Sequence, residues 1–158
     1  MSFRMRDQTD QRGEFTISTD PARLDIDVIH RYLSEESFWA AGIARDILER
    51  AIAASLCFGV YDGGEQVGFA RVVTDSATFA YLCDVFVLAP YRGRGLAKRL
   101  MEHVIAHPSL RGLRRFVLVT KDAHGLYEKF GFTPLADPSA YMHIHNPYVY
   151  QASPDGRG

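Results

Sequence analysis

The spacing of apolar residues changes along the chain. In the first third it is mainly the spacing of amphipathic helices. A short apolar run at residues 15–18 predicts a strand. Residues 25–34 and 42–54 then repeat apolar positions every three or four residues, which predicts two helices. Asp25 can cap the first of them, since an aspartate oxygen accepts from the free N–H groups of a first helical turn.

The middle of the chain has the shorter period of strands. Apolar runs at residues 55–61 and 66–74 flank the turn Asp62-Gly63-Gly64-Glu65, whose Asp-Gly chemistry is typical of a hairpin. A third run, residues 78–88, follows a second turn. Three consecutive antiparallel strands are therefore predicted.

The last third returns to mixed elements after a glycine loop. The expected elements are a helix at 96–107, a strand at 114–120, a helix at 123–130 ended by Gly131, and a last strand pair of residues 132–135 with 141–145. Residues 1–14 are polar and aperiodic, and the end of the chain is rich in small polar residues. We expect a disordered segment 1–14, one domain at 15–150 and a flexible tail at 151–158.

Composition excludes several classes of function. With 18 Lys plus Arg and 19 Asp plus Glu, the 158-residue chain has a net charge of -1 and lacks the basic field that nucleic-acid binding needs. No apolar stretch approaches the roughly 18 residues of a membrane span, and the N-terminus lacks the apolar centre of a signal peptide. We therefore expect a cytoplasmic protein without nucleic-acid or membrane partners. Cys57 and Cys83, inside apolar runs, are expected to be buried in a reducing compartment.

A strand that leads through Gly93 and Gly95 directly into a helix is the most informative stretch. The free N–H groups of the first helical turn and the positive end of the helix dipole favour an anion, for which a pyrophosphate is the natural candidate. A loop that only turns a corner is the alternative. A nucleotide-hydrolysing P-loop is excluded because no Lys followed by Ser or Thr stands after these glycines, and a dinucleotide fingerprint would need glycine where Lys98 stands.

Two motifs together resemble the GNAT superfamily of N-acetyltransferases. The first, Arg92-Gly93-Arg94-Gly95-Leu96-Ala97, follows the strand end Val87-Leu88-Ala89-Pro90 and matches the family signature, with Ala97 where glycine is more common. The second is the aromatic-rich helix that starts at Ala123-His124-Gly125 and ends in Gly131-Phe132. The resemblance covers about residues 16–135. It implies an α/β (α+β) fold whose central mixed, mostly antiparallel sheet is flanked by helices, and acetyl-CoA as the acetyl donor.

The same resemblance implies roles for individual residues. The strand before the glycine loop and the strand after its helix would splay apart, and the pantetheine arm would pair with backbone groups in the gap. Tyr127 stands where the family places the tyrosine that protonates the leaving thiolate. The implied cofactor-binding residues are Val85, Phe86, Val87, Arg92, Gly93, Arg94, Gly95, Leu96 and Ala97.

The acceptor amine must lose a proton before it can attack, because at pH 7 only about one lysine-like amine in 2,500 is neutral. The site therefore needs a group that can accept this proton. Asp84 precedes the implied oxyanion donors and is either the proton acceptor or a structural carboxylate. Glu35, Glu36 and His124 are less well placed candidates. Phe38 and Trp39 either line the acceptor pocket or pack in a core or interface.

Histidine pairs suggest no metal site. His103 and His107 are spaced i, i+4, but without a third ligand they are more typical of a solvated helix face, and the same holds for His143 and His145 on a late strand. The predicted function is direct acetyl transfer from acetyl-CoA to a primary amine of an unidentified acceptor, expected to be a small molecule. A non-catalytic coenzyme A-binding or sensing module is the alternative, and a homodimer is compatible with the resemblance.

Overall fold

The computed structural model describes residues 9–151, and a six-stranded sheet forms its centre. The strands follow one another in chain order: β1 (Thr9–Arg12), β2 (Phe15–Ser18), β3 (Leu56–Asp62), β4 (Glu65–Thr74), β5 (Phe79–Val87) and β6 (Arg115–Leu118). All neighbours pair antiparallel except β5 and β6, which are parallel. The predicted mixed, mostly antiparallel sheet flanked by helices is confirmed.

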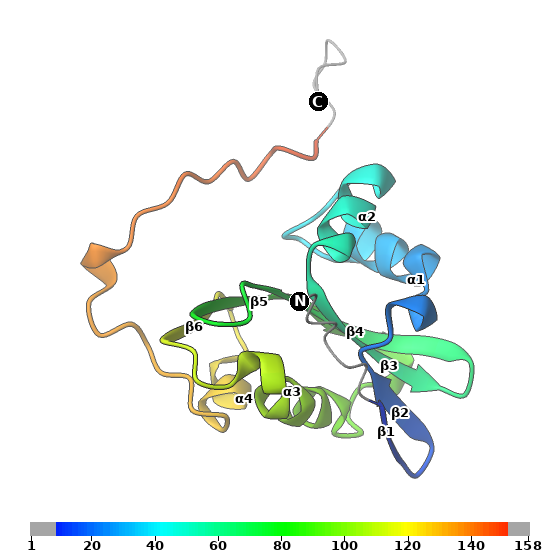
Figure 1. The fold of residues 1–158 in the computed structure, drawn as a ribbon. Coiled ribbons are helices and arrows are strands. Elements are labelled where there is room, and N and C mark those ends of the chain that lie inside the picture. The colour runs from blue at the N-terminus through cyan, green and yellow to red at the C-terminus, as the bar shows by residue number, and fades with distance from the viewer. Residues whose placement is uncertain (1–8, 152–158) are drawn as a thin grey trace, which may run out of the picture.

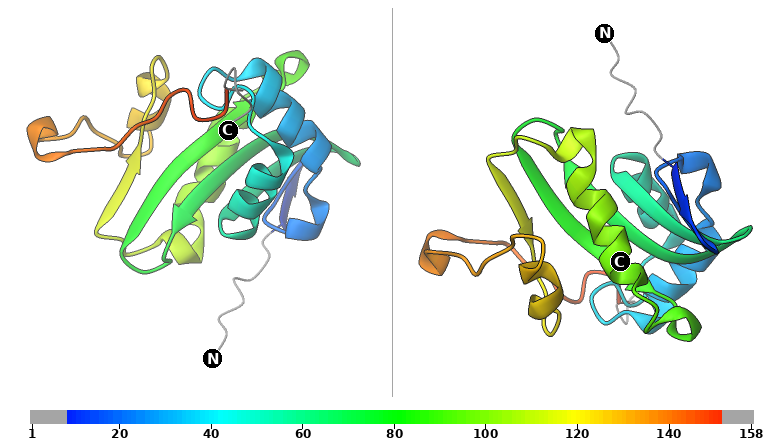
Figure 2. Two further views of the ribbon diagram at one scale, coloured as in Figure 1. Left: turned by 90° about the horizontal axis from the view of Figure 1, so that it is seen from above. Right: turned by 90° about the horizontal axis from the view of Figure 1, so that it is seen from below.

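Helices cover both faces of this sheet. They are α1 (Ile26–Arg31), α2 (Arg45–Ala53), α3 (Leu96–Ala106) and α4 (His124–Glu128). Figures 1 and 2 show α1 and α2 on one face and α3 and α4 on the other. The Asp25 carboxylate accepts from the Val28 N–H at 3.2 Å, so the predicted cap of α1 is present. Within the described residues, no helix is both long enough and apolar enough to cross a bilayer.

Two hydrophobic clusters follow from the alternation of side chains along the strands. On β4, Phe69 packs with the cluster under α1 and α2, whereas Ala70 and Val72 belong to the larger cluster under α3 and α4. Leu48 of α2 and Leu100 of α3 are fully buried in their respective clusters. The sheet is therefore buried on both faces, and its strands keep a fixed register between two helical layers.

The N-terminal prediction needs a correction. Residues 9–12, expected to be disordered, form β1, which pairs with β2 from Thr9 opposite Ser18 to Arg12 opposite Phe15. A polar strand can be held at a sheet edge because the backbone, not the side chains, supplies the ladder. Residues 1–8 and 152–158 of the predicted disordered segment and tail lie outside the described residues.

The predicted last strand pair is wrong. Residues 132–135 and 141–145 belong to no strand, and the chain between them forms a 3₁₀ turn at Pro138–Ala140. Pro134 and Pro138 lack the N–H groups that a ladder needs, and the two segments do not pair with each other in the described structure. Residues 133–151 instead run as an extended arm away from α4 and back toward α2 (Figure 1).

His107 also differs from its expected solvated setting. It is 2% exposed, and its ring lies edge-on to Phe58 with centroids 5.7 Å apart. Its Nδ1 accepts from the Ser109 N–H at 3.1 Å, while its Nε2 has no hydrogen-bond partner among the described residues. Burial lowers the pKa of His107 below its ordinary value of 6.5. The folded protein therefore holds this imidazole neutral.

We expect acid to destabilise the fold through His107. Unfolded His107 takes up a proton near pH 6.5 and folded His107 only at lower pH, so its contribution is complete above pH 6.5 and is lost as the pH falls toward the folded pKa. Urea denaturation at pH 7.5 and 5.5 measures this loss, which should shrink in His107→Gln and persist in His145→Gln, at an exposed position. Equal losses in wild type and His107→Gln would assign the effect to other groups.

Candidate functional site

A wedge opens in the sheet where β5 and β6 part. Their parallel pairing runs from Phe79 opposite Arg115 to Leu82 opposite Leu118 and stops there. β5 continues to Val87, paired on its other side with β4. The end of β5 therefore has one edge without a neighbouring strand, in agreement with the gap that the resemblance implied, and it leads directly to the glycine loop before α3 (Figure 1).

A β-bulge lies at the start of this wedge. The β4–β5 register shifts between Phe69 and Arg71, and on β5 Asp84 has a φ of +55°. Aspartate tolerates this left-handed conformation better than most residues, although it is strained. Such strain persists where surrounding contacts hold it, and bulges re-aim strands beside active sites.

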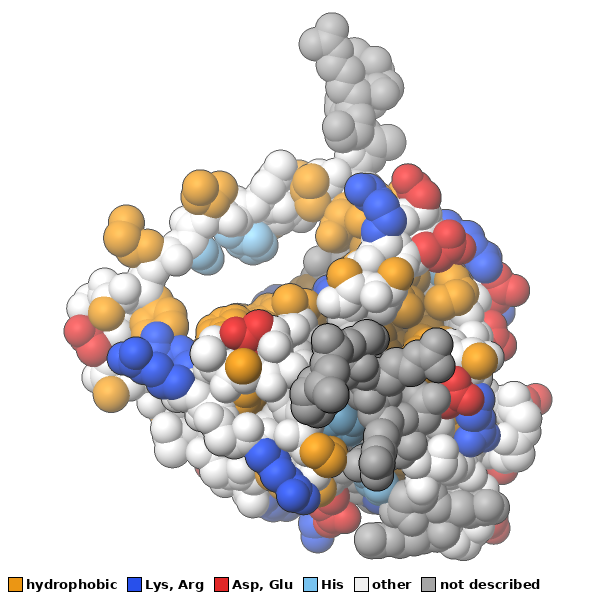
Figure 3. Space-filling view, in the orientation of Figure 1, with side chains coloured by type: hydrophobic (Ala, Val, Ile, Leu, Met, Phe, Trp, Pro, Cys, Tyr) orange, Lys and Arg blue, Asp and Glu red, His pale blue; other side chains and the backbone are white. Residues whose placement is uncertain are grey.

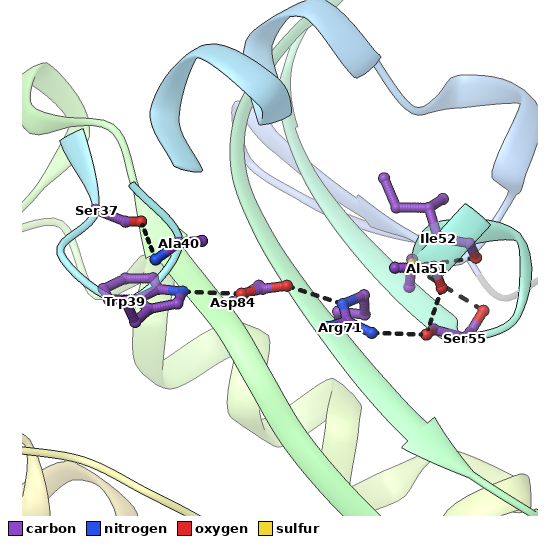
Figure 4. Close-up of polar contacts among 9 residues, drawn as sticks. Ser37, Trp39, Ala40, Ala51, Ile52, Ser55, Arg71 and Asp84 are labelled. Carbon is purple, nitrogen blue, oxygen red and sulfur yellow. Dashed lines mark hydrogen bonds and ion pairs between the residues drawn. The ribbon is translucent and has the colours of Figure 1, made fainter. Parts of the chain in front are cut away.

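Those contacts converge on the Asp84 carboxylate (Figure 4). Trp39 Nε1 donates to Oδ1 at 2.8 Å, and Arg71 Nε donates to Oδ2 at 2.8 Å. Arg71 Nη1 also donates to Ser55 Oγ at 3.1 Å, and that hydroxyl donates to the Ala51 carbonyl at 2.6 Å. Because both carboxylate oxygens already accept a hydrogen bond, this geometry favours the structural alternative for Asp84.

The backbone beyond the bulge presents groups to the wedge. The Leu88 N–H points to β4, where it donates to the Val67 carbonyl at 2.8 Å. By strand alternation, Val87 points the opposite way, and its carbonyl accepts from Arg92 Nε at 2.9 Å. The Val87 N–H thus faces the wedge. Val85 packs against the larger cluster, and Phe86 stacks on Tyr32 with ring centroids 4.0 Å apart.

The glycine loop has the conformation of an anion site. Gly93 and Gly95 have φ values of +79° and +76°, and Gly95 is the N-cap of α3. The Arg92 N–H donates to the Ala89 carbonyl at 3.3 Å, so it is not available to a ligand. The backbone N–H groups of residues 93–98 have no acceptor within the described chain. Exposed Arg94 and Lys98 add positive charge to this helix N-terminus, so the loop can hold a phosphate group.

Tyr127 lies on α4. It is 8% exposed and lines a cavity of about 290 Å³. Burial and the nearby charge of Asp122 raise its pKa, so the hydroxyl keeps its proton at neutral pH. His124 lines the same cavity. No hydrogen bond joins Tyr127 to Asp84, the two candidate catalytic side chains, among the described residues.

Phe38 and Trp39 are not core residues. Their exposed fractions are 65% and 42%, and their rings contact each other edge to face with centroids 5.2 Å apart. Lys121, from the loop between β6 and α4, places Nζ 4.2 Å from the centre of the Phe38 ring. The loop between α1 and α2 therefore contacts β5 through Trp39 and the β6–α4 loop through Phe38. Glu35 and Glu36 are exposed on the π-helical turn Tyr32–Glu36 that follows α1.

Arg71 and Lys121 escaped the sequence reasoning because neither belongs to a motif. One feature of the sequence does point to Arg71. A cation inside the apolar run 66–74 needs a buried partner of opposite charge, and Asp84 is the carboxylate inside the following apolar run. Cys57 and Cys83 flank Arg71 in register on β3 and β5, and both are free. Burial raises the pKa of each thiol to about 12, which opposes a nucleophilic role.

A wedge beside a β-bulge, next to a helix whose first amides have no acceptor among the described residues, agrees with the acetyltransferase fold that the sequence resemblance implied. The family described as "Acetyltransferase (GNAT) family" matches residues 26–132, more than half of the chain. The protein therefore belongs to the GNAT acetyltransferase family.

Individual relatives agree with this assignment. A Gibberella zeae protein named as an acetyltransferase is 36% identical over 140 residues, which cover 75% of this chain and 78% of the relative. The crystal structure of a GNAT-family protein from Xanthomonas campestris pv. campestris is 52% identical and superposes with a TM-score of 0.86 over 89% of this chain and 99% of that one. A Clostridium acetobutylicum protein whose structure includes acetyl-CoA shares the fold, with a TM-score of 0.54, 14% identity, and coverage of 76% and 86%.

Loss of the Asp84 carboxylate should destabilise the protein. Asp84→Ala leaves the Arg71 guanidinium, 18% exposed, without its counter-charge, and removing one partner of a buried pair costs about 3 kcal/mol. Urea denaturation measures this cost. The double variant Asp84→Ala/Arg71→Met should recover part of it, and Asp27→Ala, which breaks an exposed ion pair with Arg45, should change little. If the Asp84→Ala variant were as stable as wild type, the Arg71–Asp84 ion pair would not stabilise the bulge.

Proposed function

We propose that the protein is an acetyl-CoA-dependent N-acetyltransferase that transfers the acetyl group directly to a primary amine of a small-molecule acceptor. The observation that carries the proposal is the run of free backbone N–H groups at residues 93–98, at the end of the strand that borders the wedge. Membership of the GNAT family supports acetyl transfer in general. The free thiols of Cys57 and Cys83 support a reducing, cytoplasmic setting.

The glycine loop is proposed to bind the pyrophosphate through its backbone. The N–H groups of Gly93, Arg94, Gly95, Leu96 and Ala97 supply the donors, and hydrogen bonds to a charged acceptor are worth about 1.5 to 3 kcal/mol each. Arg92 contributes differently from the expectation, because its own N–H is bonded to Ala89 and its side chain ties the loop to Val87 and Tyr32. The unpaired edge of β5 at Val85, Phe86 and Val87 would take the pantetheine arm as a neighbouring strand.

Gly95→Ala should weaken coenzyme A binding by tenfold or more. A Cβ at this position has open space around it, but the φ of +76° is strained for alanine. The loop backbone must therefore shift, and its N–H groups no longer point at the bound anion. Gly112→Ala is a matched control, since Gly112 also has a positive φ of +72° and open space but lies outside the loop. Calorimetric titration with coenzyme A compares the two variants. Wild-type affinity in Gly95→Ala, or no detectable binding by wild type at millimolar coenzyme A, would contradict the proposed site.

The proposed chemistry needs few protein groups. Acetyl-CoA supplies an activated thioester, and the Val87 N–H can stabilise the charge that develops on its carbonyl oxygen. As the amine nitrogen bonds to the acetyl carbon and the carbon–sulfur bond breaks, Tyr127 is proposed to donate a proton to the departing sulfur, since its raised pKa keeps the hydroxyl protonated. The proton that the amine loses passes to solvent, from which Tyr127 is reprotonated. Asp84 is proposed to hold the bulge that aims these groups, and its two engaged oxygens support this role better than that of proton acceptor for the amine.

Tyr127→Phe should lower turnover by about 100-fold, the scale of general acid catalysis, while coenzyme A affinity stays unchanged. Thiol release from acetyl-CoA over a panel of amines measures turnover, and Tyr148→Phe, at a 69% exposed position, is the control. Unchanged turnover in Tyr127→Phe would remove this residue from the mechanism.

The coenzyme A-binding module is the second candidate function. The observation that favours it is that no hydrogen bond joins Tyr127 to Asp84 among the described residues. Tight coenzyme A binding by the wild type without thiol release for any amine in the panel would select the module over the enzyme.

A further inference from the structure

Two aromatic side chains lie exposed beside the start of the wedge. Trp39 Nε1 donates to the Asp84 carboxylate at 2.8 Å, which fixes the indole over the bulge (Figure 4). This bond uses the one polar atom of the indole, so the part of the ring that stays open to solvent is apolar. Phe38 packs edge-on against it and is more exposed still. We call Phe38 and Trp39 the aromatic pair, a rigid apolar surface of the kind that ligands contact.

The aromatic pair connects the two strands that border the wedge. Trp39 reaches β5 through its bond to Asp84. Lys121, three residues after the end of β6, places Nζ 4.2 Å from the centre of the Phe38 ring. Both contacts lie just beyond the last residues that pair between β5 and β6. The aromatic pair and the Lys121 ammonium therefore lie together where the two strands part.

Lys121 carries a positive charge without a carboxylate beside it. Its side chain is exposed and forms no ion pair with any residue that the structure describes. The neighbouring Asp122 lies near Tyr127, whose pKa it raises, and the Asp84 carboxylate already accepts two hydrogen bonds. The contact of Lys121 with the Phe38 ring is a cation–π contact, which is weak at an exposed position. A carboxylate on a ligand would make a stronger, charge-assisted bond to the same ammonium.

The aromatic pair lies on the side of the sheet from which an acceptor can approach. The α3 N-terminus, with its glycine loop, belongs to the opposite helical layer, so a coenzyme held there leaves the α1–α2 side free (Figures 1 and 2). Figure 3 shows an opening on this side, between the body of the protein and the arm of residues 133–151. The α1–α2 loop borders this opening, because a Cβ on its Gly42 would lie 2.8 Å from the Tyr150 carbonyl oxygen of the arm.

We propose that the acceptor is an amine that also carries a carboxylate, and that Lys121 binds this carboxylate while the aromatic pair contacts the apolar part of the molecule. The inference rests on the proposed function, since it names the acceptor class for the same transfer. The Lys121 charge favours amino acids and related amino carboxylates. It disfavours acceptors with a second cation at this end, such as polyamines.

Trp39 fluorescence tests the binding step without turnover, because Trp39 is the only tryptophan of the chain. Amino acids and their carboxamides, which keep the shape but lose the charge, are titrated in the presence of coenzyme A. At least one amino acid should bind about tenfold more tightly than its carboxamide, since it gains a charge-assisted bond. Lys121→Gln should reduce this ratio to about twofold, and Lys121→Arg should retain it. Lys129→Gln, which removes an exposed lysine at the end of α4, is the matched control and should keep the wild-type ratio.

Four results of this titration would overturn the proposal. They are no fluorescence response to any amino acid at millimolar concentration, equal binding of acids and carboxamides by wild type, a preference for acids that survives in Lys121→Gln, and an equal loss of affinity for both members of a pair in Lys121→Gln. The last result would indicate that Lys121 only holds the loop that carries Phe38.

Thiol release from acetyl-CoA with the same acid and carboxamide pairs separates this inference from the proposed function. The ratio of the two KM values should follow the ratio of affinities in wild type and in each variant. Thiol release without any preference for the acids would overturn the acceptor class and leave the transfer intact. A preference for acids in the fluorescence titration, without thiol release for any pair, would support the Lys121 site and contradict the transferase.

Discussion

The ion pair between Arg71 and Asp84 is the interaction on which the site depends. Asp84 occupies a left-handed backbone conformation that an aspartate adopts at some cost, at a bulge beyond which β5 does not pair with β6. Two partners hold the carboxylate in place, one from the neighbouring strand and one from the α1–α2 loop. Through Ser55, the same guanidinium also reaches the end of α2. The Asp84 carboxylate therefore connects strand β4, the end of α2 and the loop between α1 and α2.

The end of β5 and the glycine loop before α3 are adjacent in the chain but offer different groups to a ligand. The end of β5 presents the Val87 N–H to the wedge, and the α3 N-terminus presents a row of amides without acceptors among the described residues, an arrangement that suits an anion. Arg92 connects them, since its side chain bonds to the Val87 carbonyl while its own N–H closes the turn before the loop. A phosphate held at the loop and a group held along β5 would therefore keep a fixed separation. Binding energy at the loop could then position a group at the bulge.

Sequence predicted the parts of this site that depend on neighbours along the chain. The turn at Gly95 and the cap of α1 at Asp25 are local, so residue type and spacing were sufficient. The bond between Trp39 and Asp84 joins residues 45 positions apart and follows only from the folded sheet. His107 is a different kind of miss, because the signal was present. It directly follows α3, seven positions after Leu100 and three after Val104, which both belong to the buried face of that helix.

The failed prediction of the last strand pair shows a limit of pattern reasoning. Alternation at residues 141–145 indicates what the side chains can do, but a strand exists only when its backbone groups have a partner. Within residues 9–151, the segment 141–145 pairs with no strand, and one edge of β6 has no neighbouring strand. Each feature alone invites non-specific association, which natural sheets usually prevent by covering or charging an edge. The alternation at residues 141–145 was therefore a true side-chain pattern, but the strand pairing predicted from it does not exist among the described residues.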